Sequence, residues 1–224
     1  METKKLNNFK HIMVLDDHPL IRSSIISILK RKYPDSIYYE ASNGNQGLEL
    51  IKSILPDLIL VDIDMPLING IEFLRTIRKQ GIHSKVILIT VHSEKELIIY
   101  AKKLQANGYL TKNIDPEQFL YFIEEVEENN LFVVPGEYYK SLTKEVISEF
   151  DTILSTINLL TDREIEVFRL MYNGFKNKEI ADNLCITVKS VENYKNRIVN
   201  KLGDINFILN DLMREKSHIL KFLI

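Results

Sequence analysis

Hydrophobic positions in the first 128 residues follow two alternating patterns. Short runs rich in β-branched and aliphatic residues alternate with longer stretches that have one polar and one apolar face. The short runs predict strands at 11–15, 37–41, 58–62, 85–90 and 109–111. The longer stretches predict helices near 19–32, 44–54, 70–79, 94–105 and 116–128. This alternation predicts an α/β fold with a doubly wound, five-stranded parallel sheet.

From residue 158 onward the pattern contains helix signals only. Thr161 and Glu164 have the spacing of a capping box, which predicts that the first of these helices begins there. Further helices are predicted at about 177–184, 188–202 and 205–216. A short turn joins the first two of these, which predicts a helix-turn-helix with 188–202 as the recognition helix. This part is therefore expected to be an all-α domain.

Residues 131–157 separate the two patterns. A Pro-Gly break is followed by apolar residues at spacings of 4, 3 and 4, namely Val146, Phe150, Ile153 and Ile157. This spacing predicts a helix with one apolar stripe. Packing of the stripe on its own domain is favoured over a dimerising coil, because fewer than about three heptads are present. The predicted organisation is an α/β domain at 1–130, a linker at 131–157 and a helix-turn-helix domain at 158–224.

Composition narrows the class of protein. No apolar run approaches the roughly 18 residues that span a bilayer, and no signal-peptide pattern is seen, so a cytoplasmic protein that binds no membrane is expected. The one cysteine, Cys185, cannot form an intrachain disulfide and is expected to be a small buried apolar residue. Residues 158–224 are the only basic part, with 11 Lys and Arg against 9 Asp and Glu. This surplus alone is too small to predict a nucleic-acid partner.

Polar residues follow several of the predicted strands. Asp16 and Asp17 follow the first strand, and Asp62 ends the third; Thr90 ends the fourth, and Lys112 follows the fifth. Ligands of doubly wound sheets bind at the carboxyl ends of the strands, so these side chains are expected at one edge. Two carboxylates about 4 Å apart repel by on the order of 4 kcal/mol at an effective dielectric near 20. An open site of oxygen ligands suits Mg²⁺.

Bound Mg²⁺ would allow a phosphoryl group to approach this edge. Lys112 is expected to balance another phosphoryl charge, and the Thr90 hydroxyl to donate a hydrogen bond. One of the carboxylates is then placed to attack phosphorus and to hold an acyl phosphate.

Together these residues resemble the receiver domain of two-component response regulators, over residues 10–128. The resemblance is carried by Asp16-Asp17, by Asp62 with Met65-Pro66 and Gly70, and by Thr90, Tyr109 and Lys112. It implies a flavodoxin-like strand order, 2-1-3-4-5. It also implies that Asp62, three residues ahead of Met-Pro, is the phosphoacceptor.

The resemblance further implies a metal site and a switch. The implied Mg²⁺ ligands are Asp17, Asp62 and the backbone carbonyl of Asp64, with Asp16 nearby. Thr90 and Tyr109 match a switch pair, in which the hydroxyl moves to the phosphate and the aromatic ring swings inward. His18 and His92 are expected near the site but are given no ligand role, because no His or Cys cluster accompanies them.

One class of enzyme shares part of this motif. Haloacid-dehalogenase-type phosphatases place a nucleophilic Asp and an acid/base Asp two residues apart, as Asp62 and Asp64 are. In that class the motif normally ends the first strand and is followed by Thr or Val, whereas here it ends the third and Met-Pro follows. A phosphatase would also leave Asp16 and Asp17 without a role, so this interpretation is less favoured.

Residues 159–203 resemble the LuxR/NarL-type DNA-binding domain. The matching positions are Thr161, Arg163-Glu164, Glu166-Val167, Gly174, 177–181, Leu184, Ser190-Val191 and Lys201-Leu202-Gly203. The resemblance implies that the major groove is faced by Glu192, Asn193 and Asn196. There Asn can pair with adenine, and Glu can accept a hydrogen bond from cytosine. The residues expected at DNA phosphates are Lys178, Lys189, Lys195, Arg197 and Lys201. Lys is frequent in the family at the position of Glu192, and His at that of Tyr194, which leaves the base preference open.

The two resemblances imply a response regulator rather than an enzyme. A sensor histidine kinase would phosphorylate Asp62 and shift the population towards a state in which a homodimer binds double-stranded DNA and controls transcription. Two recognition helices on half-sites about one helical turn apart would double the phosphate contacts. The second hypothesis is a DNA-binding protein with a degenerate receiver, but the complete set of Asp17, Asp62 and Lys112 argues against it.

Overall fold

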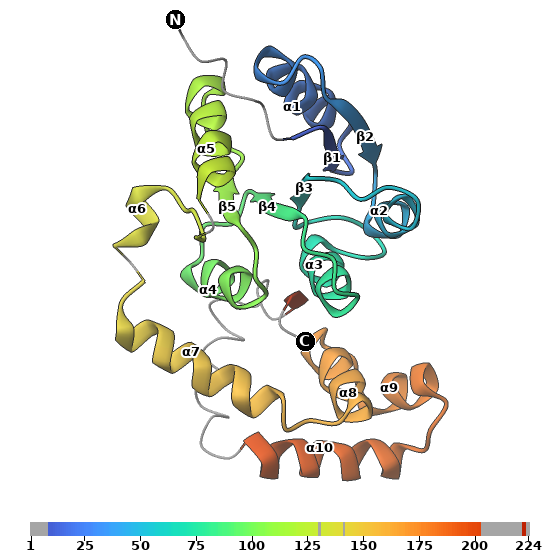
Figure 1. Cartoon of the computed structure of the whole chain (residues 1–224). Coiled ribbons are helices and arrows are strands. Elements are labelled where there is room, and N and C mark those ends of the chain that lie inside the picture. Colours follow the sequence, from blue (N-terminus) through green and yellow to red (C-terminus); the bar gives the residue numbers. More distant parts are fainter. Residues whose placement is uncertain (1–8, 130, 141, 203–220, 223–224) are drawn as a thin grey trace, which may run out of the picture. The chain divides into compact units, whose positions relative to one another are not determined.

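Two compact parts make up the chain. The computed structural model describes residues 9–129, 131–140, 142–202 and 221–222. Contacts divide the chain into a first unit, Met1–Leu142, and a second unit, Thr143–Ile224 (Figure 1). Over the described ranges, no helix is both long and apolar enough to cross a bilayer. The helix predicted at 205–216 lies outside these ranges.

The first unit contains one parallel sheet. Its strands are β1 (His11–Leu15), β2 (Ile37–Ala41), β3 (Leu58–Asp62), β4 (Lys85–Thr90) and β5 (Gly108–Thr111). The strand order is β2-β1-β3-β4-β5, and every adjacent pair is parallel. The predicted doubly wound fold and its 2-1-3-4-5 order are therefore confirmed.

Five helices connect and flank these strands: α1 (Pro19–Lys32), α2 (Gly44–Ile51), α3 (Gly70–Lys79), α4 (Lys95–Lys103) and α5 (Pro116–Glu128). Pro19 and Pro116 occupy first turns, where the missing N–H removes no helical hydrogen bond. The Asn69 side chain caps α3 by accepting from the backbone N–H of Glu72 at 2.9 Å. Helix α4 ends two residues before its predicted end, because Gln105 has left-handed backbone geometry with φ +61° and turns the chain.

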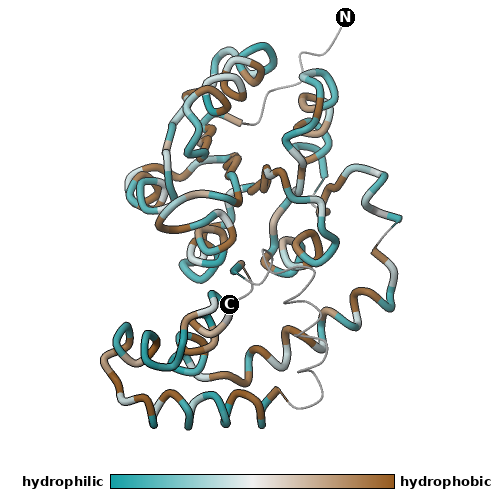
Figure 2. The backbone as a smooth tube through the Cα atoms, turned by 180° about the vertical axis from the view of Figure 1, so that it is seen from behind, coloured by the Kyte–Doolittle hydropathy of each residue, from teal (hydrophilic) through white to brown (hydrophobic). Residues whose placement is uncertain are grey.

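Both faces of the sheet are covered. Alternate residues of the central strands pack with α1 and α5 in one core cluster; they include Ile12, Val14, Leu58, Leu60, Ile87 and Ile89. Helices α2, α3 and α4 lie on the other side (Figure 1). Burial on both faces explains why these strands form continuous apolar runs, visible as the brown centre of the first unit in Figure 2.

The remaining described helices are short or belong to the second unit: α6 (Gly136–Tyr139), α7 (Lys144–Ile157), α8 (Asp162–Tyr172), α9 (Asn177–Leu184) and α10 (Val188–Leu202). The capping box predicted for α8 is present, with the Glu164 carboxylate accepting from the Thr161 N–H at 2.8 Å. Three residues of the predicted apolar stripe, Phe150, Ile153 and Ile157, are buried, and α7 contacts α10. Helices α8, α9 and α10 contact one another and enclose a small core.

The prediction that Cys185 is buried is wrong. Cys185 follows the last residue of α9 with φ +53°, in the left-handed region, and is exposed. Its N–H bonds back to α9 and closes the helix. The residue therefore lies in the turn before α10 and does not contribute to the core.

Candidate functional site

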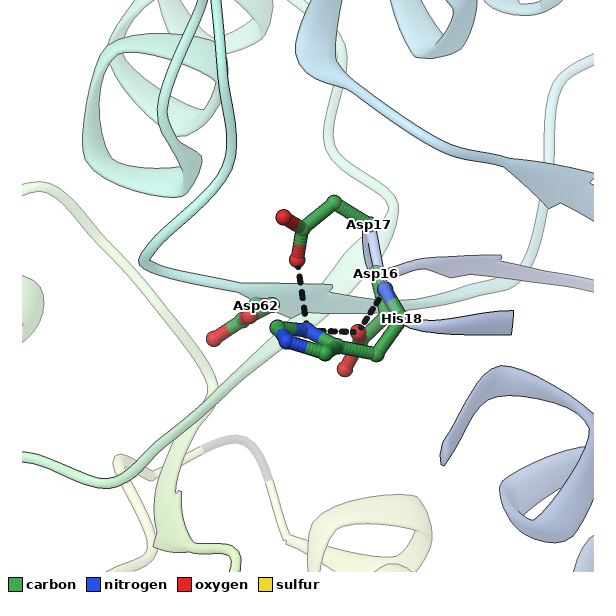
Figure 3. A group of neighbouring side chains, drawn as sticks. All are labelled: Asp16, Asp17, His18 and Asp62. Atoms are coloured by element: carbon green, nitrogen blue, oxygen red, sulfur yellow. Dashed lines mark hydrogen bonds and ion pairs between the residues drawn. The ribbon is translucent and has the colours of Figure 1, made fainter. Parts of the chain in front are cut away.

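The carboxyl ends of the strands gather acidic side chains at one edge of the sheet. Asp16 and Asp17 directly follow β1, and Asp62 is the last residue of the neighbouring strand β3 (Figure 3). Asp16 and Asp62 are almost fully buried, whereas Asp17 keeps a third of its side chain exposed. The predicted convergence of these three carboxylates is therefore found.

Lys112 links the two buried carboxylates. Its Nζ lies 2.8 Å from Asp62 Oδ2 and 2.8 Å from Asp16 Oδ2. Burial raises the pKa of Asp62 from 3.8 to about 6, although the hydrogen bond and charge of Lys112 lower it in part. Burial disfavours the charged form of Lys112, but its bonds to Asp16 and Asp62 outweigh this and raise its pKa. Lys112 is thus held as an ammonium ion between two carboxylates.

Gly70 sets the position of the loop after β3. A Cβ built on Gly70 would lie 2.2 Å from the carbonyl oxygen of Asp62, so only glycine lets α3 begin this close to the strand. The Gly70 N–H donates to the carbonyl of Ile63 at 3.0 Å. Leu67 adopts φ +68° within the same loop. The motif from Asp62 to Gly70 is thus a tight loop that fixes the end of β3.

The oxygens of the two buried carboxylates differ in their hydrogen bonds. Asp16 Oδ1 accepts from the His18 N–H at 2.8 Å, and its Oδ2 contacts Lys112. Asp62 Oδ2 contacts Lys112, while its Oδ1 accepts only a long bond of 3.3 Å from the Asp64 N–H. Of the two oxygens that do not face Lys112, Asp62 Oδ1 therefore has the longer hydrogen bond.

Both histidines near the site contact its acids, which the sequence interpretation missed. His18 Nδ1 lies 2.8 Å from Asp17 Oδ1 and 3.4 Å from Asp16 Oδ1 (Figure 3). His92 Nε2 lies 2.5 Å from Asp64 Oδ2. The first pairing has a signal in the sequence, because His18 adjoins Asp17. The second joins two loops 28 residues apart and follows only from the sheet order.

Thr90 and Tyr109 are joined through the backbone of His92. Thr90 Oγ1 accepts from the His92 N–H at 3.1 Å, and the Tyr109 hydroxyl donates to the His92 carbonyl at 3.1 Å. The Tyr109 ring is fully buried, and burial raises the pKa of its hydroxyl well above the usual range. Thr90 and Tyr109 therefore act on the same loop between β4 and α4.

The donor set fits a hard divalent cation. Asp16, Asp17, Asp62 and His18 each offer one ligand atom, and these atoms lie within 4.8 Å of one another. Three of the four are carboxylate oxygens, the donor type that Mg²⁺ prefers. The His18 nitrogen is the softer donor and already contacts Asp17. The acidic cluster is thus able to hold a metal through its carboxylates.

The second unit presents a polar helix. Glu192, Asn193 and Asn196 of α10 are exposed. The Arg197 guanidinium lies 5.7 Å above the ring of Tyr194, one turn earlier. Lys178 and Lys189 are also exposed, whereas Lys195 Nζ donates to Asn177 Oδ1 at 3.0 Å and ties α10 to α9. The face of α10 that is predicted to read DNA is therefore accessible.

Lys201, which is half-buried, pairs with a buried carboxylate. Its Nζ lies 2.6 Å from Oε2 of Glu164, whose side chain is 3% exposed, and also donates to the Leu159 carbonyl at 3.0 Å. Burial would raise the pKa of Glu164, but the bonds from Lys201 and Thr161 lower it overall. The Lys201 ammonium therefore holds α10 against α8, and this contact competes with its predicted role at DNA phosphate.

Comparison with known proteins finds a family match in each part of the chain. Residues 12–124 match the family described as "Response regulator receiver domain", and residues 158–206 match "Bacterial regulatory proteins, luxR family". The nitrate/nitrite response regulator protein NarL of Escherichia coli K12 is 31% identical over 191 residues, which cover 85% of this chain and 88% of NarL. This chain is a response regulator of the NarL/FixJ family.

Other response regulators support the assignment. The transcriptional regulatory protein DegU of Brevibacillus brevis is 28% identical over 86% of this chain and 87% of DegU. The crystal structure of a LuxR-family two-component response regulator from Aurantimonas sp. SI85-9A1 gives a TM-score of 0.56 at 26% identity, covering 61% of this chain and 97% of that one.

Family membership fixes the general function. As a response regulator, the protein combines a receiver domain with a LuxR-type DNA-binding domain. Its control of transcription depends on phosphorylation. The receiver domain implies a histidine kinase as partner. The family consists of transcription regulators and not of enzymes, so the phosphatase alternative is excluded.

Proposed function

We propose that Asp62 is the residue that a sensor histidine kinase phosphorylates. The observation that carries this proposal is the contrast between the two buried carboxylates. Both contact Lys112, but Asp62 Oδ1 has only the long bond from Asp64. With a pKa of about 6, Asp62 is mostly ionised at neutral pH and is more basic than an ordinary carboxylate. Asp62 Oδ1 is therefore the better nucleophile.

In the proposed step, Asp62 Oδ1 attacks the phosphorus of a phosphohistidine on the kinase. The new O–P bond forms as the P–N bond breaks, and the departing imidazole nitrogen keeps the electron pair. In this proposal the phosphoryl oxygens would be stabilised by Lys112, which contacts Asp62, and by the hydroxyl of Thr90, which ends the neighbouring strand β4. The product is an acyl phosphate at the end of β3.

The metal proposed for this site is Mg²⁺. Asp17, Asp62 and the backbone carbonyl of Asp64 would hold it, with Asp16 nearby. Bound Mg²⁺ supplies positive charge that offsets the carboxylates and the incoming phosphoryl oxygens. The excess of carboxylates over the single Lys112 ammonium in this cluster supports a divalent cation.

The phosphoryl group would act on the loop between β4 and α4. Thr90 now accepts a hydrogen bond from the His92 N–H, and Tyr109 donates to the carbonyl of the same residue. Turning the Thr90 hydroxyl towards phosphate removes the first of these bonds. The resulting population shift, with Tyr109 as its aromatic partner, constitutes the proposed switch.

The proposed output is binding of a homodimer to DNA in the cytoplasm. In this proposal 1–130 is the receiver domain, 131–157 the linker and 158–224 the DNA-binding domain. The residues proposed to read bases are Glu192, Asn193 and Asn196. The residues proposed at phosphates are Lys178, Lys189, Lys195 and Arg197. Lys201 is proposed to act mainly through Glu164, by holding the recognition helix in place.

Incubation with Mg²⁺ and acetyl phosphate tests the phosphoacceptor. We expect wild-type protein and Asp64→Asn to gain the mass of one phosphoryl group, and Asp62→Ala and Asp62→Asn to gain none, because only Asp62 supplies the nucleophile. Intact-mass spectrometry is the measurement. A phosphoryl group retained by Asp62→Ala would show that another residue accepts it.

A further inference from the structure

A small hollow lies beside α10, where the chain turns from α9 into this helix. It has a volume of about 160 Å³ and is lined by Ile186, Ser190, Asn193, Tyr194 and Arg197. Ile186, Ser190 and Tyr194 are half-buried, whereas Asn193 and Arg197 are exposed. The inner part of the hollow is therefore mainly apolar, and its outer part carries an amide and a guanidinium group. Such a lining suits a ligand that has both an apolar part and a negative charge.

The ring of Tyr194 supports the cation of this hollow. The Arg197 guanidinium lies 5.7 Å from the centre of the Tyr194 ring, within the roughly 6 Å over which the face of a ring attracts a cation. A guanidinium held over a ring still has N–H donors along its edge, and their planar arrangement matches two oxygens of a phosphate. Tyr194 and Arg197 thus form a preorganised pair that can bind an anion.

Ser190 brings a hydroxyl group to the same hollow. Its Oγ lies 2.9 Å from Thr187 Oγ1, and its backbone N–H donates to the same atom at 3.1 Å. Ser190 and Arg197 are seven residues apart, which is about two helical turns, so both lie on one side of α10. A hydroxyl and a guanidinium on one side of the helix can both donate to the same anion.

This side of α10 flanks the face that is proposed to read bases. Val191 and Ile198 are buried in the core, and Asn196 is exposed. At about 100° per residue, Ser190 and Arg197 lie between the core side and the face that includes Asn196. The major groove is about 12 Å wide and a helix about 10–12 Å across, so the flanks of an inserted helix meet the walls of the groove. These walls consist of sugar and phosphate.

We propose that the hollow binds one deoxyribose-phosphate unit of the DNA backbone, with Arg197 and Ser190 at the phosphate and the apolar surface of Ile186 and Tyr194 at the sugar. Tyr194 is also a positioning residue, because its ring holds the Arg197 guanidinium beside the hollow. A base does not enter, because it would first have to leave the helical stack. This inference deepens the proposed function and rests on α10 being the recognition helix.

Duplexes in which one phosphate has lost its charge test the ligand of the hollow. The wild-type protein, with Mg²⁺ and acetyl phosphate present, selects a duplex from a random-sequence pool, and an uncharged methylphosphonate then replaces one phosphate at a time. The quantity compared is the ratio of the Kd for each modified duplex to the Kd for the unmodified one. Because both values come from the same protein variant, a smaller folded fraction does not change this ratio.

We expect one phosphate in each half-site at which the ratio is about 3 to 10 for the wild type, the usual range for one hydrogen-bonded contact. At this phosphate the ratio is expected to fall to about one in Arg197→Ala, because the cation that recognises the charge is gone. Lys189→Ala is the matched control, since Lys189 is exposed on the same helix. It is expected to bind more weakly and to keep the wild-type ratio at this phosphate.

Two substitutions separate the ring of Tyr194 from its hydroxyl. Tyr194→Phe keeps the ring face and is expected to keep the wild-type ratio at this phosphate. Tyr194→Leu keeps an apolar side chain but loses the ring, so its ratio is expected to fall about 2-fold or more towards one.

The proposal is overturned if no phosphate loses its effect in Arg197→Ala, or if Tyr194→Leu keeps the wild-type ratio. An equal fall in Tyr194→Phe and Tyr194→Leu would also overturn it, because the hydroxyl and not the ring would then be responsible. If the wild-type protein selects no duplex at all, the DNA-binding function itself is contradicted instead.

Discussion

At the scale of single residues, Asp62 combines the role proposed for it with a cost in stability. Its pKa in the folded protein, about 6, lies above the ordinary 3.8 because the carboxyl is buried, so ionisation opposes folding. The stability associated with the protonated form is fully present below about pH 4 and is lost as the pH rises through about 6. If Asp62 is the nucleophile proposed above, this loss of stability accompanies its function at neutral pH.

Asp62→Asn is therefore expected to stabilise the metal-free protein. Asn cannot ionise, so at neutral pH the free energy of unfolding of the variant is expected to exceed that of the wild type by about 1–3 kcal/mol. The gain is at the lower end of this range if Lys112 is destabilised by the loss of its charged partner. Urea unfolding in a chelating buffer, near pH 4 and near pH 7.5, measures the difference.

Exposed Asp35 provides the control. Asp35→Asn is expected to change the free energy of unfolding by no more than about 0.5 kcal/mol at either pH. If Asp62→Asn stabilises the protein equally at both pH values, the stability difference does not come from ionisation of Asp62.

The positions of single site residues were predictable where they depend only on the ends of the strands. Asp16, Asp62, Thr90 and Lys112 could be placed from the sequence because each follows or ends a strand, and parallel strands end at one edge. The ion pair of Lys201 with Glu164 joins residues 37 apart and depends on how α10 crosses α8, which helical periodicity does not specify. The exposure of Cys185 depends on a left-handed turn at a position where glycine is the usual residue, so this cysteine gives no sequence signal for the turn.

At the scale of elements, the close approach of α3 to β3 is the most demanding contact of the site. Gly70→Ala would bring a methyl group against the Asp62 carbonyl, which is backbone and cannot rotate away. We expect a loss of about 1–3 kcal/mol in the free energy of unfolding. We also expect slower phosphorylation by acetyl phosphate, because the end of β3 must shift.

Gly136 is the matched position for this test. It opens α6, and a Cβ there meets nothing within 4 Å. Gly136→Ala is expected to be neutral or stabilising by up to about 1 kcal/mol and to leave phosphorylation unchanged. Equal effects of the two substitutions would show that the contact of Gly70 with Asp62 has no special importance.

The elements themselves were largely predictable, with physical reasons for the exceptions. Continuous apolar runs specify strands that are buried on both faces, and prolines and capping residues specify where α1, α5 and α8 begin. The pairing of Val133 with β5 was not predicted, because one bridge formed by a single residue leaves no periodic pattern in the sequence.

At the scale of the whole molecule, the response regulator must convert phosphorylation into recognition of a DNA sequence. Lys178→Ala is expected to weaken binding to all duplexes alike and to reduce the slope of log K against log salt by about 0.9, because the phosphate contact proposed for Lys178 would be lost. Asn193→Ala is expected to change the preferred base at one position, with a difference of about 1–3 kcal/mol in binding free energy between bases, because the base-edge contact proposed for Asn193 would be lost.

Binding isotherms for the selected duplex and its single-base variants, at several salt concentrations, distinguish these effects. Identical patterns for the two variants would contradict the division into phosphate-contacting and base-reading residues. Lys201→Ala is expected to differ from both, because loss of the Glu164 partner also lowers the free energy of unfolding.

The exposed thiol of Cys185 also gives the protein a natural chemical handle. It is the only cysteine in the chain, and it lies in the turn between α9 and α10, immediately before the recognition helix. A maleimide fluorophore or a spin label would therefore attach at one known position of the unmodified sequence. Such a probe would allow the arrival of DNA at the recognition helix to be followed in real time in the wild-type protein.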